Sequence, residues 1–140
     1  SIMTITLATL PQATEQQIFD QVVTHLAKQR KGAHLEEKGC AYRGEGGSMC
    51  AAGCLIADSE YEPAMDTIGG PTAWDSLVSQ GFAPPQHEQF ILELQRIHDR
   101  HFGSEEMDND ALSDALAKFY PVTIRSNLSE KVLDEVIEAL

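Results

Sequence analysis

The chain has 140 residues, of which 42% are hydrophobic, so it can bury one core but is short for two ordinary domains. Its formal net charge of −12 lies within residues 51–140, which carry 17 acidic and five basic side chains. Such a negative surface repels phosphate, so we expect no nucleic-acid partner and no binding to anionic membranes. Solubility alone accounts for this charge; a basic protein partner and mimicry of nucleic acid are the functional alternatives.

The cysteine pattern points to reduced thiols. All three cysteines lie within residues 39–61, with nine and three residues between them. Their odd number, together with the lack of a secretory signal pattern and of any apolar run near 18 residues, predicts a cytoplasmic protein. We expect one domain over residues 1–140, in which residues 1–2 are a cloning remnant ahead of Met3.

The first predicted element is an N-terminal strand or extended arm over residues 3–10, where apolar side chains alternate with Thr and Ala. Thr14 and Gln17 have the spacing of a capping box, and a helical apolar stripe follows over residues 15–29. Residues 38–50 predict a small antiparallel element of two or three strands around a glycine-rich turn.

The remaining elements are predicted to be mainly helical. Residues 50–57 are small and rich in alanine, which favours two turns of a buried helix over a second short strand. Further predictions are a short helix carrying Trp74, helices over residues 87–102 and 111–120, an extended segment after Pro121, and a last helix capped by Ser129. The expected fold is therefore mainly α, a single-domain helical fold of four to five helices with a small antiparallel β-hairpin.

Three kinds of chemistry compete for the stretch around Cys50. Cys50 and Cys54 are one helical turn apart and, with Cys40 and a histidine, could form a zinc-type site. Because no paired knuckle is present, we predict no bound metal and no other cofactor. A cysteine at a helix start suits a nucleophile, and a glycine turn before a helix suits a phosphate cradle, although both known glycine signatures are missing. Simple packing of small residues needs no chemistry at all.

Two histidines form the second candidate feature. His98 and His101 lie on the stripe of the 87–102 helix where hydrophobic side chains are expected. They could act as metal ligands or as an acid and a base. Asp99 points about 100° away from His98, so we expect that it does not orient that ring. The alternative is that both histidines simply lie at a solvent-exposed helix end, where they interact favourably with the helix dipole. The candidate catalytic residues are Cys50, Cys54, His98 and Asp99, and the candidate binding residues are Tyr42, Arg43, Gly46, Trp74 and His101.

Several motifs together resemble a family of small bacterial, phage and mobile-element proteins. They are Leu10-Pro11-Gln12-Ala13-Thr14, Phe19-Asp20-Gln21-Val22-Val23, His25-Leu26, Cys40-x-Tyr42-Arg43-Gly44, Cys50-Ala51-Ala52-Gly53-Cys54-Leu55-Ile56 with Asp58 and Tyr61, and Leu94-Gln95-Arg96-Ile97-His98-Asp99. The resemblance spans about residues 7–102. The family has no assigned activity, so the resemblance implies a cytoplasmic, phage-related or mobile-element protein without transferring a catalytic role. It also favours proximity of the cysteine block and the His98–Asp99 pair.

The leading functional hypothesis is a non-enzymatic binding or interaction module. We expect a homo-oligomer that associates through the N-terminal strand or the last helix, and a protein partner is possible. The alternative is a small thiol- or histidine-dependent hydrolase or transferase, with Cys50 or Cys54 as nucleophile and His98 or His101 as base.

Overall fold

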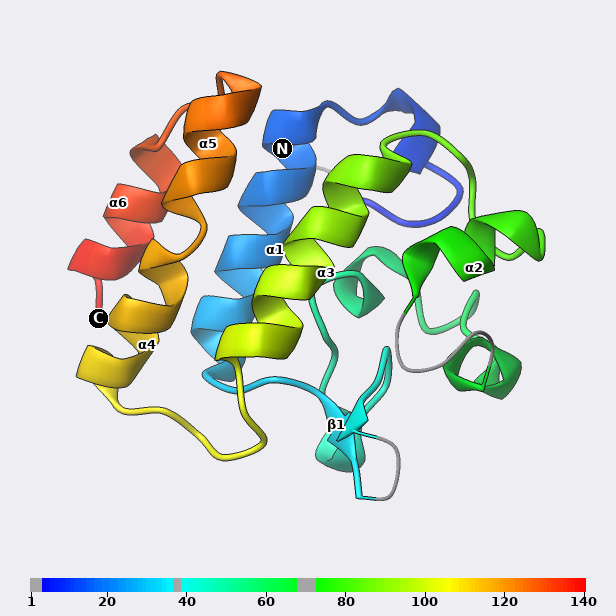
Figure 1. Ribbon diagram of the computed structural model, residues 1–140, viewed down its shortest axis with the longest axis horizontal. Coiled ribbons are helices and arrows are strands. Elements are labelled where there is room, and N and C mark those ends of the chain that lie inside the picture. Colours follow the sequence, from blue (N-terminus) through cyan, green and yellow to red (C-terminus); the bar gives the residue numbers. More distant parts are fainter. Residues whose placement is uncertain (1–3, 37–38, 68–72) are drawn as a thin grey trace.

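Helix α1 (Glu15–Gln29) is the element around which the other helices pack (Figure 1). The structure is a computed structural model that describes residues 4–36, 39–67 and 73–140. α1 contacts α3 (Glu88–His101) on one side and α4 (Asn109–Ala117) and α6 (Lys131–Glu138) on the other. The single, mainly helical domain is therefore confirmed.

The sequence of α1 explains both its start and its buried face. The Thr14 hydroxyl accepts a hydrogen bond from the Gln17 amide at 3.1 Å, and the Gln17 side chain accepts one from the Thr14 amide at 2.9 Å. This confirms the predicted capping box, which satisfies two donors that the first turn leaves unpaired. Five side chains of α1 are fully buried: Ile18, Phe19, Val22, Val23 and Leu26.

Helix α3 lies beside α1 and also packs against α2 (Trp74–Ser79) (Figure 1). Its inward stripe, Phe90, Ile91 and Leu94, continues one turn further to His98, which is fully buried. The predicted helix over residues 87–102 and the short helix carrying Trp74 are thereby confirmed. The stripe is long enough that a histidine at its end is enclosed by the core rather than left in solvent.

The predicted N-terminal strand is wrong for the described residues 4–10. A turn precedes a 3₁₀ helix at Leu10–Gln12, because the Thr6 carbonyl accepts from the amides of Thr9 and Leu10. The arm lies against its own chain: the Gln21 side chain bonds both the amide and the carbonyl of Ile5. Residues 1–3, which include the expected cloning remnant, lie outside the described residues.

The predicted strands near residues 38–50 shrink to a two-residue ladder. β1 (His34–Leu35) pairs antiparallel with β2 (Gly39–Cys40), and beyond them the described residues add one bridge between Arg43 and Met49. The glycine turn is as expected, with φ of 69° at Gly46 and 78° at Gly47. The small antiparallel element is therefore shorter than predicted and lies earlier in the chain.

The two-turn helix predicted over residues 50–57 is also wrong. The chain makes a single 3₁₀ turn at Gly53–Leu55 and then leaves as extended backbone at Ile56. The Arg43 guanidinium donates to the carbonyls of Gly53 and Ile56, at 2.8 and 2.6 Å. The Gly53 carbonyl also accepts from the Ile56 amide within the turn, whereas the Ile56 carbonyl, which a longer helix would use for its own ladder, bonds Arg43 instead. A tertiary contact thus overrides the helix propensity of the alanines.

The C-terminal third forms three helices on the flank of α1. The expected helices over residues 111–120 and after Ser129 correspond to α4 and α6. The segment after Pro121, expected to be extended, is α5 (Tyr120–Ser126), because proline is well tolerated in the first turn of a helix. None of the helices within the described ranges is both long and apolar enough to cross a membrane.

Candidate functional site

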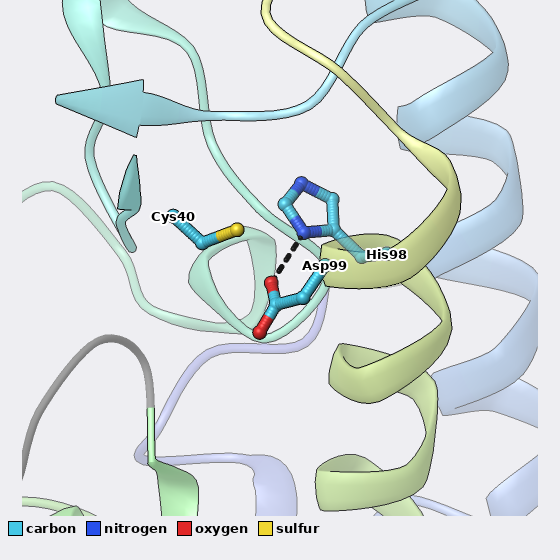
Figure 2. Close-up of side chains that lie close together, drawn as sticks. All are labelled: Cys40, His98 and Asp99. Carbon is cyan, nitrogen blue, oxygen red and sulfur yellow. Dashed lines mark hydrogen bonds and ion pairs between the residues drawn. The ribbon is translucent and has the colours of Figure 1, made fainter. Parts of the chain in front are cut away.

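Three side chains that can bind a metal or take part in a reaction meet where β2 faces the end of α3 (Figure 2). They are Cys40, His98 and Asp99, which we call the Cys–His–Asp cluster. One sulfur, nitrogen or oxygen atom from each lies within 4.8 Å of the other two, and this is the one group of its kind in the described ranges. The cysteine beside the His98–Asp99 pair is Cys40; Cys50 and Cys54, the predicted catalytic cysteines, do not belong to this group.

The prediction that Asp99 does not orient His98 is wrong. Oδ1 of Asp99 lies 2.9 Å from Nδ1 of His98 (Figure 2). Nδ1 is the ring nitrogen nearer the backbone, so a carboxylate on the next residue reaches it despite the angle between their Cα–Cβ bonds. The Ala33 amide donates to Nε2 of the same ring at 3.2 Å, so the proton of the neutral ring sits on Nδ1 and is donated to Asp99.

Gln95 connects this cluster to the segment that follows Cys50, and sequence reasoning missed it. Its side chain is 1% exposed. Its amide nitrogen donates to Asp99 at 2.6 Å, and its oxygen accepts from the buried Ala52 amide at 2.8 Å. The available signal was its position one helical turn before Asp99, where i and i+4 side chains meet. The network therefore joins residues 33, 40 and 52 to one end of α3.

The Cys40 thiol is protonated at neutral pH. Burial raises its pKa to about 12, and both the charge of Asp99 and a hydrogen bond to Asp99 act in the same direction. A nucleophilic thiol needs the opposite environment, a nearby cation or helix N-terminus that stabilises the thiolate. The cluster also differs from a catalytic triad, because Asp99 lies near both partners while the far nitrogen of His98 faces the Ala33 amide.

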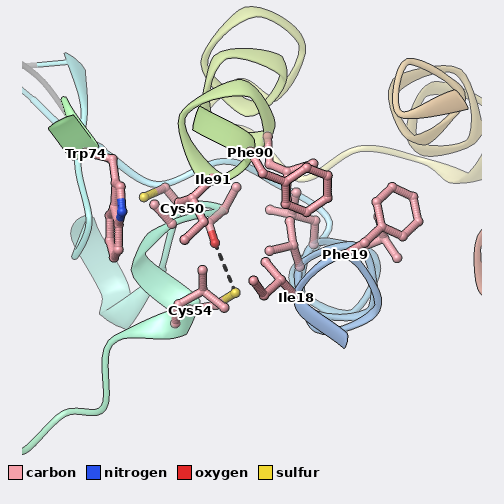
Figure 3. Close-up of a cluster of buried hydrophobic side chains, with 14 of the residues drawn as sticks. Ile18, Phe19, Cys50, Cys54, Trp74, Phe90 and Ile91 are labelled. Carbon is pink, nitrogen blue, oxygen red and sulfur yellow. Dashed lines mark hydrogen bonds between the residues drawn. The ribbon is translucent and has the colours of Figure 1, made fainter. Parts of the chain in front are cut away.

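Cys50 and Cys54 lie in the hydrophobic core rather than in this cluster (Figure 3). Sγ of Cys50 accepts a hydrogen bond from the Gly53 amide at 3.2 Å, and Sγ of Cys54 donates one to the Ala51 carbonyl at 3.1 Å. Burial raises the pKa of both thiols, that of Cys54 to about 12. In this setting both cysteines act as small apolar side chains.

Arg43, a predicted binding residue, uses its side chain for contacts within the same chain. Its side chain is 14% exposed, pairs with Asp58 at 3.2 Å and lies over the Tyr61 ring at 5.0 Å. Together with its hydrogen bonds to the carbonyls of Tyr42, Gly53 and Ile56, this fixes the loop that follows the 3₁₀ turn. Asp66, which sequence reasoning missed, performs a related role by accepting from the Tyr42 amide at 2.7 Å and from the Tyr61 hydroxyl.

The other predicted binding residues lie in three different places. Tyr42 and Trp74 are buried and pack edge to face, with ring centroids 6.2 Å apart. His101 is half-buried at the end of α3, where burial lowers its pKa, and it is not part of the Cys–His–Asp cluster. Gly46 is exposed at its turn. These residues therefore do not form a single binding site.

Gly46 does line a hollow in the surface of the described residues. It is an open groove of about 820 Å³, lined by Lys31, Gly32, His34, Leu35, Glu36, Glu45, Gly46, Ser48 and Ser104. The ring of His34 also stacks on that of His98, with centroids 6.2 Å apart and planes 21° apart. The groove thus adjoins the cluster through one histidine.

Comparison with known proteins adds no relative. No family model matches the chain, and neither a curated protein nor a solved structure matches it.

Proposed function

We propose that this chain is a non-enzymatic binding module, as the leading sequence hypothesis holds. The observation that supports it is the state of the reactive groups: the thiols are held protonated, and the polar atoms of His98 and Gln95 bond to groups of the same chain. An enzyme would instead present an activated nucleophile or a base to a pocket. The thiol-dependent alternative has less support, because Cys50 and Cys54 are in the core.

The charge distribution favours a basic protein as the partner. Residues 104–140, which form the α4–α6 flank, carry nine acidic and three basic side chains. The exposed acids of this flank are Glu105, Glu106, Asp108, Asp110, Asp114, Asp134, Glu135 and Glu138. Complementary charge raises the association rate and gives specificity, whereas two copies of this flank repel each other at low salt. The homo-oligomer stays a prediction, and the folded-back arm is a poor surface for it.

The test is binding of a lysine-rich peptide to two matched variants. Asp110→Asn with Asp114→Asn removes two charges from α4, and Glu62→Gln with Asp75→Asn removes two exposed charges from the side that carries α2. Calorimetry at low and moderate salt is expected to show about two- to tenfold weaker binding for the α4 variant alone. Equal weakening in both variants, or no binding by the wild type, would contradict a basic partner on this flank.

A further inference from the structure

We propose that Cys40, His98 and Asp99 bind one zinc-type divalent cation in the place of the protons that they now share. The three side chains point toward one another from β2 and α3 (Figure 2), and their potential ligand atoms already lie within 4.8 Å of one another. This inference concerns a site outside the α4–α6 flank, goes beyond the binding function proposed above, and departs from the sequence prediction of no bound metal because of the geometry of the cluster.

The donor set selects the ion. A thiolate, an imidazole and a carboxylate are the ligands that zinc accepts in tetrahedral sites, whereas calcium and magnesium require oxygen ligands. Tetrahedral zinc holds its ligand atoms about 3.3–3.7 Å apart. The separation of 2.9 Å between His98 and Asp99 must therefore widen slightly, and the widest pair must close by about an ångström. Three protein ligands leave a fourth position for water.

The surroundings provide both access and support. The side chain of Asp99 is 32% exposed and Cys40 is half-buried, so an ion can reach the fully buried His98 from the solvent side. Gln95 donates to the Asp99 carboxylate from within the helix and is itself held by the Ala52 amide. Such outer hydrogen bonds orient metal ligands and raise affinity.

Binding is a proton exchange without any change of oxidation state. The Cys40 thiol releases its proton to solvent, and its sulfur lone pair binds the ion. His98 binds through Nδ1, so its proton moves by way of water to Nε2, and the Ala33 amide loses its acceptor. One proton is released for each ion bound. Ala33 directly precedes His34, which lines the groove, so the loss of this hydrogen bond acts next to the groove wall.

The experiment uses the full chain after treatment with a chelator and removal of that chelator. Native mass spectrometry with added zinc is expected to show one ion for each chain, and cobalt is expected to give the absorption of a thiolate–metal bond. Cys40→Ser and Asp99→Asn should each weaken zinc binding by at least about tenfold. Cys54→Ala, which removes a core thiol outside the cluster, should bind zinc as the wild type does.

Three results would overturn the site: no zinc on the wild type, undiminished binding by Cys40→Ser, or cobalt binding without thiolate absorption. The second result would indicate capture by surface carboxylates. Should Cys40→Ser fail to fold, Asp99→Asn and the cobalt spectrum decide the matter. Peptide binding at the α4–α6 flank, measured without zinc, is independent of these outcomes, so failure of one proposal is distinguishable from failure of the other.

Discussion

Replacing Gln95 by alanine is expected to remove about 3–5 kcal/mol from the free energy of unfolding. The Ala52 amide is buried and would lose its acceptor, which costs about 1–3 kcal/mol. The hydrogen bond to the charged Asp99, at 2.6 Å, contributes about 1.5–3 kcal/mol more. Domains of this size are stable by only about 5–15 kcal/mol, so the loss would be a large share of the total.

Urea unfolding followed by far-ultraviolet circular dichroism measures this loss. The matched control is Gln89→Ala, an exposed glutamine on the same helix, which is expected to change stability by less than about 0.5 kcal/mol. The reasoning is refuted if Gln95→Ala lies within about 1 kcal/mol of the wild type, because the two hydrogen bonds would then contribute little net stability.

Two further predictions concern Gly53, which follows Cys50, and His25, which contacts the Met49 carbonyl. Gly53→Ala is expected to cost about 1–3 kcal/mol, because its Cβ would lie 2.3 Å from the Tyr42 carbonyl oxygen; Gly103→Ala, which meets nothing within 4 Å, should be nearly neutral in thermal melts. Burial lowers the pKa of His25, whose Nε2 lies 2.8 Å from the Met49 carbonyl, so the unfolded chain takes up a proton more readily. Stability should therefore fall as pH drops below about 6.5, and less steeply in His25→Gln; equal slopes in urea titrations would contradict this.

Local signals in the sequence predicted the two central helices. The capping box at Thr14 and the apolar stripe that follows belong to one continuous segment, so no distant contact is needed to identify α1. The stripe of α3 likewise placed His98 correctly on the inward face. Both helices bury enough apolar surface that tertiary packing agrees with the local pattern.

Side-chain hydrogen bonds decided the elements that the sequence did not predict. Alternating residues before Leu10 read as a strand, but the Thr9 hydroxyl accepts from the Thr6 amide at 2.9 Å, and the two threonines favour a turn. The alanines after Cys50 read as a helix, but the Ile56 carbonyl, which would extend it, accepts from Arg43. Neither competing bond follows from periodicity, because each depends on side-chain hydrogen bonds rather than on the apolar pattern.

The candidate site was predicted in part for the same reason. His98 and Asp99 were identified from the helix pattern, while their cysteine proved to be Cys40, which the fold brings from β2. The small residues around Cys50 favoured Cys50 over Cys40 as the reactive cysteine. In the structure these small residues are buried and pack closely in the core. Gln95 was overlooked because the role of a buried glutamine depends on its hydrogen-bond partners. The side-chain oxygen of Gln95 accepts from the Ala52 amide, 43 positions away in the sequence.

The motifs behind the family resemblance and the acidic flank occupy different parts of the fold. The Cys40, Arg43 and Gln95 motifs bond to one another or to the loop between them, and these contacts hold residues 33–36 and 39–58 against α3. The acidic residues after position 104 lie beyond that network, on α4 and α6, which pack against α1, and in the segments that lead into these two helices. Since substitutions in separate regions act additively, charge changes on α4 should alter partner binding without altering the unfolding loss of Gln95→Ala. A coupling between the two would mean that the network and the flank act as one site.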